Sequence, residues 1–191
     1  MISDFHTHNP NADNAIINAE PHNFAPLPGK FYSVGIHPWS NQCTLADVKR
    51  LVALSSHPQV VAIGEAGIDL AKSALPLDEQ RRLLIFHALL AERRKLPLII
   101  HCVRASHIIA ELLKELKPSV PWIIHGFRYN AAVAASLLRF PCVKLSFGEH
   151  FNPEALRATP AHRRLAETDC SLLSIAEILT LHACALTPPH P

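Results

Sequence analysis

Six residues that could bind metal ions stand at the ends of apolar runs in the sequence. They occur in the stretches DFHTH, AIGE, PLIIHC, PWIIHG and AETD, and they are His6, His8, Glu65, His101, His125 and Asp169. One histidine in such a position is usually a hydrogen-bonded structural residue, but six polar residues in the same position indicate a common cause. Imidazole and carboxylate ligands without thiolates suit Zn, Mn, Co, Fe or Mg.

The spacing of these residues predicts a particular chemistry. His6 and His8 are two residues apart, so in a strand they point the same way and can chelate one ion. Glu65 can bridge two ions through its two oxygens, and the two later histidines can hold the second ion. Asp169 can bind the first ion and take a proton from a water. Two divalent ions roughly 3.5–4 Å apart that share a water suit phosphoryl hydrolysis, with Asp169 and Glu65 as the predicted catalytic residues.

The elements that must position these residues alternate along the chain. Apolar, strand-like runs occupy 1–5, 32–36, 60–64, 97–100, 121–124, 142–147 and 163–167, and helical patterns occupy 45–54, 77–94, 106–116, 131–138 and 172–184. This alternation predicts a parallel α/β fold, either a doubly wound sheet or a (β/α) barrel. In both folds the carboxyl ends of the strands share one face, where the six residues would meet.

Length and composition predict one globular domain over residues 1–191, with a disordered tail at 184–191. A full barrel typically needs about 250 residues, so a chain of 191 residues predicts an abridged one. The loop-like stretch 11–30 stands where a first strand–helix unit is expected. Hydrophobic residues make up 49% of the chain and charged residues 18%, and the net charge of +2 neither marks nor excludes a nucleic-acid binder.

The sequence also predicts a cytoplasmic protein. No apolar run is long enough to cross a membrane, and the first ten residues, MISDFHTHNP, do not resemble a signal peptide. The five cysteines are odd in number and lack a CxxC pair, which indicates reduced thiols. Cys102 follows His101 and should point to the opposite face of its strand, so we expect a structural thiol there, not a nucleophile.

Three further residues are candidates for substrate contacts. His37, in VGIHPW, follows the second apolar run and would line the same pocket. Arg104 and Arg128 follow two of the metal-site histidines closely and could bind phosphate. His150 has a weaker case for the same face. We expect surface or packing roles for the histidines in helical or tail contexts, which are His57, His87, His107, His162, His182 and His190.

The stretches DFHTH, VGIHP, AIGEAGID, PLIIHC, IIHGF and ETD, in this order, resemble the TatD family of metal-dependent hydrolases, within the amidohydrolase-like barrels. The stretches IIHCVRA and LSFGEHFNPEAL are similar to a shorter bacterial branch. The resemblance covers residue 1 to about 184. It implies a TIM-like (β/α) barrel, abridged in its first β/α unit and at its C-terminus, with two divalent metal ions at the carboxyl face. By motif, the same six residues fall on the family's metal positions.

This sequence departs from the family pattern in two places. Val103 and Arg104 stand where many members have Arg and then Asp, and nothing after Cys184 resembles the family's C-terminal helix.

The resemblance implies a metal-dependent hydrolase, namely a phosphodiesterase or deoxyribonuclease that uses a water activated by two metals. The substrate would be a DNA end, a short single strand or a small phosphoester, and no membrane partner is expected. One alternative is an amidohydrolase-like enzyme that cleaves a small ester or amide. Many such enzymes carry a carboxylated lysine at the bridging position, which is Glu65 here. The other alternative is a metal-binding protein without enzymatic activity. The oligomeric state stays open.

Overall fold

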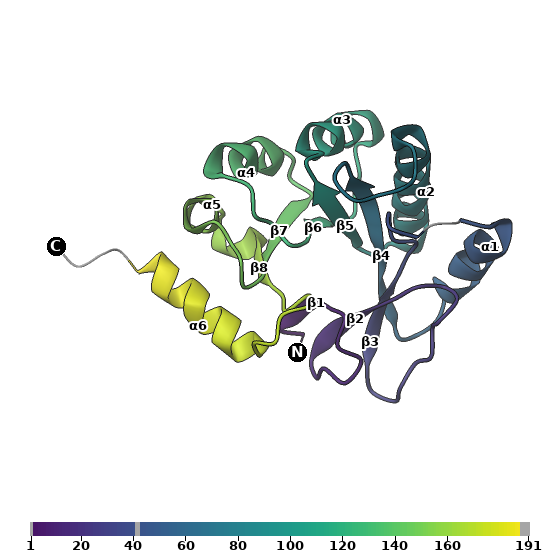
Figure 1. Ribbon diagram of the computed structural model, residues 1–191, viewed down its shortest axis with the longest axis horizontal. Coiled ribbons are helices and arrows are strands. Elements are labelled where there is room, and N and C mark those ends of the chain that lie inside the picture. The colour runs from purple at the N-terminus through teal and green to yellow at the C-terminus, as the bar shows by residue number, and fades with distance from the viewer. Residues whose placement is uncertain (1, 41–42, 188–191) are drawn as a thin grey trace.

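Eight parallel strands form one curved sheet in the computed structural model, which describes residues 2–40 and 43–187 (Figure 1). Each strand pairs with the next along the chain, so the sheet order follows the sequence. The strands are β1 (Asp4–Thr7), β2 (Ala15–Ala19), β3 (Phe31–Val34), β4 (Val60–Asp69), β5 (Leu98–Val103), β6 (Trp122–Ile124), β7 (Val143–Phe147) and β8 (Arg164–Ala166).

A short bridge joins the two ends of this sheet. Thr7 pairs in parallel with Asp169, the backbone N–H of Asp169 donates to the carbonyl of His6 at 2.9 Å, and that of His8 donates to the carbonyl of Asp169 at 3.0 Å. The sheet is therefore a nearly closed TIM-like barrel, which confirms the predicted fold class. The doubly wound alternative is wrong.

The helices lie outside the barrel, and all but the last connect successive strands (Figure 1). They are α1 (Leu45–Leu54), α2 (Leu77–Arg94), α3 (Ser106–Leu116), α4 (Ala131–Leu138), α5 (Pro153–Ala158) and α6 (Ile175–Leu186), with a 3-10 turn, η1 (Ala161–Arg163), before β8. The first four coincide with the predicted ranges, whereas α5 was not predicted. The predicted start of the tail at 184 was too early, because α6 continues to Leu186; residues 188–191 of that tail lie outside the described residues.

The prediction of a loop over residues 11–30 was wrong in part. Ala15–Ala19 forms β2, which pairs in parallel with both β1 and β3, and its first three residues are buried. Within the described residues no helix follows β1 or β2. The first units are thus abridged by the absence of helices after β1 and β2 in the described residues, while the strand β2 itself is present.

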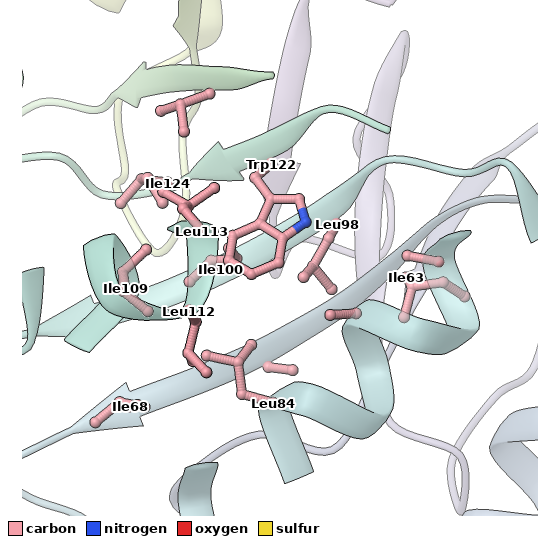
Figure 2. Close-up of a cluster of buried hydrophobic side chains, with 14 of the residues drawn as sticks. Ile63, Ile68, Leu84, Leu98, Ile100, Ile109, Leu112, Leu113, Trp122 and Ile124 are labelled. Carbon is pink, nitrogen blue, oxygen red and sulfur yellow. The ribbon is translucent and has the colours of Figure 1, made fainter. Parts of the chain in front are cut away.

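The alternation of side chains in the strands explains how the barrel positions its histidines. Leu98, Ile100 and Trp122 point outward and pack against α2 and α3, where Figure 2 shows them beside Leu84 and Leu112. A separate small cluster contains Ile16, Ala62, Ile99 and Ile123. His101 and His125 lie two residues beyond Ile99 and Ile123, so they share the inward direction of these residues and lie toward the carboxyl mouth. No helix in the described parts of the chain is long and apolar enough to cross a membrane.

Candidate metal centre

The carboxylate of Glu65 lies at the centre of the barrel mouth, buried among imidazole rings. Its Oε1 atom lies 2.6 Å from Nδ1 of His101, 2.7 Å from Nε2 of His125 and 3.0 Å from Nε2 of His37. Three rings from three different segments therefore converge on one oxygen of one carboxylate.

The second oxygen of Glu65 faces the opposite group of residues. Oε2 lies 3.2 Å from Nε2 of His6 and 3.4 Å from Nε2 of His8. The Oδ1 atom of Asp169 lies 3.8 Å and 3.6 Å from the same two ring nitrogens. The structure thus brings all six sequence-predicted residues together. Glu65 lies between one group at the end of β1 and in the segment after β8, and another group at the ends of β5 and β6.

Local backbone geometry makes this convergence possible. The register between β4 and β5 shifts between Ile63 and Ala66, and the strand β4 continues past Glu65 to Asp69. Gly67 pairs with His101 across the two strands, and a Cβ atom at Gly67 would lie only 1.9 Å from the carbonyl oxygen of His101. A larger residue at position 67 would therefore push β5, and with it the His101 ring, away from Glu65.

The donor set fits divalent metal ions. Three groups each offer donor atoms that lie within 4.8 Å of one another, namely His6 with Glu65 and His125, His6 with His8 and Asp169, and His37 with Glu65 and His101. Nε2 of His6 and Oε2 of Glu65 are buried without a hydrogen-bond partner. Unpartnered buried polar atoms are costly, and a cation bound by nitrogen and oxygen donors would satisfy them.

The charged groups of this cluster shift the pKa values of one another. Burial raises the pKa of Glu65, but the charges of His125 and His6 and a hydrogen bond from His101 outweigh it and hold that pKa well below its usual value. Burial lowers the pKa of His125, but attraction by Glu65 and Glu167 outweighs it and holds that pKa well above its usual value. The attraction between the Glu65 carboxylate and the surrounding imidazoles therefore favours the charged form of both Glu65 and His125.

Two buried carboxylates behind the histidines were missed by the sequence reasoning. Oδ2 of Asp69 lies 3.1 Å from Nε2 of His101, and Oε1 of Glu167 lies 3.4 Å from Nδ1 of His125. Burial raises the pKa of Asp69, but hydrogen bonds from Trp39, His101 and backbone N–H groups lower it to about 2. Carboxylates in this position orient the imidazoles and fix their tautomers.

The predicted substrate residues lie around the same mouth. His37 reaches Glu65 directly, as described above. Arg104 and Arg128 line an adjoining cavity of about 510 Å³, together with Trp39 and Lys72. They line the approach to Glu65 and form no described ion pair with the six central residues.

Cys102 also lines this cavity, and its Sγ atom lies 3.6 Å from the hydroxyl of Tyr129. Burial raises the pKa of its thiol to about 11, so the thiolate that a nucleophile needs is scarce near neutral pH.

The remaining histidines lie outside the central cluster. His87 and His182 are buried in packing, His57 is half-buried, and His107 and His162 are exposed. His150 is exposed beside a smaller hollow next to Asp169. His190 lies outside the described residues.

A nearly closed parallel barrel with imidazoles and carboxylates at its carboxyl mouth defines the class of (β/α)-barrel metal-dependent hydrolases. Residues 23–176 match the family described as TatD related DNase. The chain therefore belongs to the TatD-related DNase family.

Similar proteins agree with this membership. The chain is 32% identical over 157 residues to the uncharacterized metal-dependent hydrolase YabD of Bacillus subtilis, across 75% of this chain and 60% of YabD. It is 34% identical over 101 residues to the 3′-5′ ssDNA/RNA exonuclease TatD of Rahnella sp., across 50% of this chain and 37% of that protein. The chain thus spans less than two thirds of the length of these relatives.

A solved structure supports the fold. The crystal structure of YJJV, a TatD homologue from Escherichia coli K12, superimposes with a TM-score of 0.76 at 21% identity, covering 90% of this chain and 78% of that one.

Proposed function

We propose that this chain is a metal-dependent phosphodiesterase that binds two divalent cations and hydrolyses nucleic acid at an end of a strand. The observation that carries the proposal is the position of Glu65. One of its oxygens faces the rings of His101 and His125, and the other faces the rings of His6 and His8. A carboxylate with a set of nitrogen donors on each oxygen is the arrangement that a bridging ligand of two ions requires.

Each side chain has a defined task in this proposal. His6, His8 and Asp169 would hold one cation, His101 and His125 the other, and Glu65 both. Bound divalent cations supply positive charge for the phosphoryl oxygens and lower the pKa of water. His37 lies on the same side of Glu65 as His101. Its Nδ1 atom accepts the backbone N–H of Trp39 at 3.0 Å, so its Nε2 atom, which contacts Glu65 at 3.0 Å, is the donor and would turn its hydrogen bond to the substrate once Glu65 binds the cations.

Asp169 is the proposed proton acceptor. Its carboxylate is part-exposed at the mouth, while that of Glu65 is buried, so water reaches Asp169 more easily. A water oxygen bonds to phosphorus and its proton passes to an Oδ atom of Asp169. The bond from phosphorus to the leaving oxygen of the strand breaks, and that oxygen takes up the proton from Asp169, which restores the carboxylate.

The surroundings of the site favour a phosphodiester over a neutral ester or amide. Three cationic side chains, Lys72, Arg104 and Arg128, line the cavity beside the imidazoles, and guanidinium groups bind phosphate through two parallel hydrogen bonds. The similarity to a relative named as a 3′-5′ ssDNA/RNA exonuclease supports a single-stranded substrate.

The proposal is tested by removing and restoring metal. Chelated protein should release no product from single-stranded DNA, and Mn²⁺, Mg²⁺, Zn²⁺ or Co²⁺ should restore release, with a panel of small esters and amides assayed in parallel. Hydrolysis of the panel without hydrolysis of DNA would favour an amidohydrolase-like enzyme. A metal-loaded protein inert toward both would be a metal-binding protein only.

A further inference from the structure

Two cavities of unlike charge open onto the candidate metal centre. The first, the basic cavity, is the 510 Å³ cavity that carries Lys72, Arg104 and Arg128. The second, the polar cavity, has a volume of about 430 Å³ and is lined by Asn18, Glu20, Asn23 and Ser40 as well as by the central histidines. Both cavities share the lining residues Trp39, His101, His125 and Asp169. A substrate held at the metal centre can therefore extend into both.

The charged side chains are distributed unevenly between these cavities. No lysine or arginine of the described chain lines the polar cavity, and Glu20 is its one carboxylate outside the proposed metal ligands. The Oε2 atom of Glu20 accepts a hydrogen bond from the Ser40 hydroxyl at 2.9 Å, and Asn23 accepts from the Glu20 backbone N–H at 3.0 Å. His22 lies beside it, with Nδ1 at 3.6 Å from Oε2. The Glu20 carboxylate is thus held in place on the wall of the polar cavity.

Trp39 lies at the boundary between the two cavities and is fixed there. Its indole N–H donates to Oδ2 of Asp69 at 2.6 Å, and the Nζ atom of Lys72 lies 4.9 Å from the centre of its ring. The side chain is nevertheless 46% exposed, so its ring is available to a ligand. Nucleobases stack on such exposed aromatic rings without regard to sequence.

A nucleic-acid strand that is cleaved near its end carries unequal charge on the two sides of the cleaved bond. The two cavities differ in charge in the same way. On one side of the cleaved bond lies the retained strand with a phosphate at every nucleotide. On the other side lies a terminal nucleoside that carries no further phosphate, unless the end itself is phosphorylated. Such an end phosphate adds about 1.5 to 2 negative charges near neutral pH.

We propose that the basic cavity holds the retained strand, that the polar cavity holds the terminal nucleoside, and that Glu20 selects ends with a free hydroxyl over ends with a phosphate. This inference rests on the proposed function and deepens it by naming the kind of end that is cleaved. The carboxylate of Glu20 can accept a hydrogen bond from a sugar hydroxyl, whereas it repels a terminal phosphate. Lys72 interacts with the retained strand and is indifferent to the end group.

The test compares oligodeoxynucleotides of one sequence that differ only in their end group. One pair carries a hydroxyl or a phosphate at the 3′ end, and a second pair carries them at the 5′ end. Cleavage is measured near pH 8 with the metal-loaded protein, and binding is measured by fluorescence anisotropy in chelator, which needs no catalysis. We expect the wild-type protein to cleave and to bind the hydroxyl end about tenfold better than the phosphate end at whichever terminus it attacks.

Three variants separate the possible results. Glu20→Gln should reduce the preference for the hydroxyl end over the phosphate end to about threefold or less. The phosphate end should be bound and cleaved better, because the amide keeps the shape of the carboxylate and loses its charge. Glu115→Gln, the same change at an exposed position of α3 that lines neither cavity, should retain the wild-type preference. Lys72→Gln should weaken binding of both ends by the same factor.

Equal cleavage and binding of both ends by the wild-type protein would overturn this inference and leave the proposed function standing. Unchanged discrimination in Glu20→Gln would do the same. Cleavage of none of the four oligonucleotides at any metal concentration would overturn the proposed function, and this inference with it.

Discussion

The Oδ2 atom of Asp69 lies 3.1 Å from Nε2 of His101, on the side of the ring opposite to Glu65. The same carboxylate accepts the indole N–H of Trp39 and, through Oδ1, the backbone N–H groups of Ala71 and Lys72. Asp69 therefore connects the candidate metal centre to the wall of the basic cavity. If it accepts the proton of Nε2, the Nδ1 atom of His101 keeps a lone pair directed at the proposed metal position.

Asp69→Asn tests this role. The amide can keep hydrogen bonds to the backbone, but it loses the charge that fixes the tautomer of His101. We expect the affinity for the more weakly bound ion to fall by about 10- to 100-fold, while the melting temperature of the metal-free protein changes little. Isothermal titration of the metal-free protein with Mn²⁺ measures the first quantity. An unchanged titration curve would show that Asp69 only supports the turn at 69–72.

How far the sequence predicts this site depends on the continuity of each strand. His101 and His125 follow continuous apolar runs, and their inward direction follows from Ile99 and Ile123 by simple alternation. Asp69 was missed because β4 has an irregular register and continues four residues beyond Glu65, where a strand end was expected.

Two other features cannot be placed from the local sequence alone. The strand β2 is short and is not followed by a helix, so no strand–helix alternation marks it. Its backbone hydrogen bonds are made with β1 and β3, which are tertiary contacts that no local pattern encodes. Glu167 has a visible signal, since it comes two residues before Asp169, but its partner His125 is distant in the sequence.

Asp169 has separable roles in its backbone and its side chain. Its backbone closes the barrel through hydrogen bonds with His6 and His8, and its φ angle of 51° lies in the left-handed region. Asparagine tolerates this conformation better than other non-glycine residues. We therefore expect Asp169→Asn to keep the fold and most of the metal, while the rate of hydrolysis falls by at least about 100-fold.

Asp169→Ala is the matched comparison. It should lose as much activity and in addition roughly 1–2 kcal/mol of stability, because alanine is strained at positive φ. Product release in a single-turnover assay, together with urea denaturation of both variants, measures the two effects. Near-normal turnover by Asp169→Asn would refute its assignment as the proton acceptor.

Because the two oxygens of Glu65 face different histidines, we expect that one of the two proposed ions can be lost without the other. His101 and His125 both lie on the Oε1 side, while His6 and His8 lie on the Oε2 side. The double variant His101→Ala with His125→Ala should therefore retain one ion per chain where the wild-type protein retains two. Elemental analysis after dialysis measures the ratio, and His107→Ala, at an exposed position of α3, is the control. Two ions in the double variant would contradict the assignment of these histidines to the second ion.

The burial of His87 leads us to expect a loss of stability in mild acid that is independent of the candidate metal centre. This histidine of α2 is fully buried, its Nε2 atom accepts the backbone N–H of Ile36 at 3.0 Å, and its Nδ1 atom lies 2.7 Å from the carbonyl of Leu83. Burial lowers its pKa to about 4 from an ordinary value of 6.5. The folded protein therefore binds this proton less readily than the unfolded chain, so its contribution to stability is present above pH 6.5 and is lost as the pH falls toward 4.

Between pH 7 and pH 5 the free energy of unfolding should fall by about 2 kcal/mol through this residue alone. Urea denaturation of the chelated protein at the two pH values measures the change. His87→Gln should be less stable at pH 7, because it disturbs a buried contact, and its stability should depend less on pH by the same 2 kcal/mol or so. His107→Gln, exposed on α3, should follow the wild-type slope. A His87→Gln variant with the full wild-type slope would place the acid sensitivity in other groups, of which the cluster around Glu65 is the first to examine.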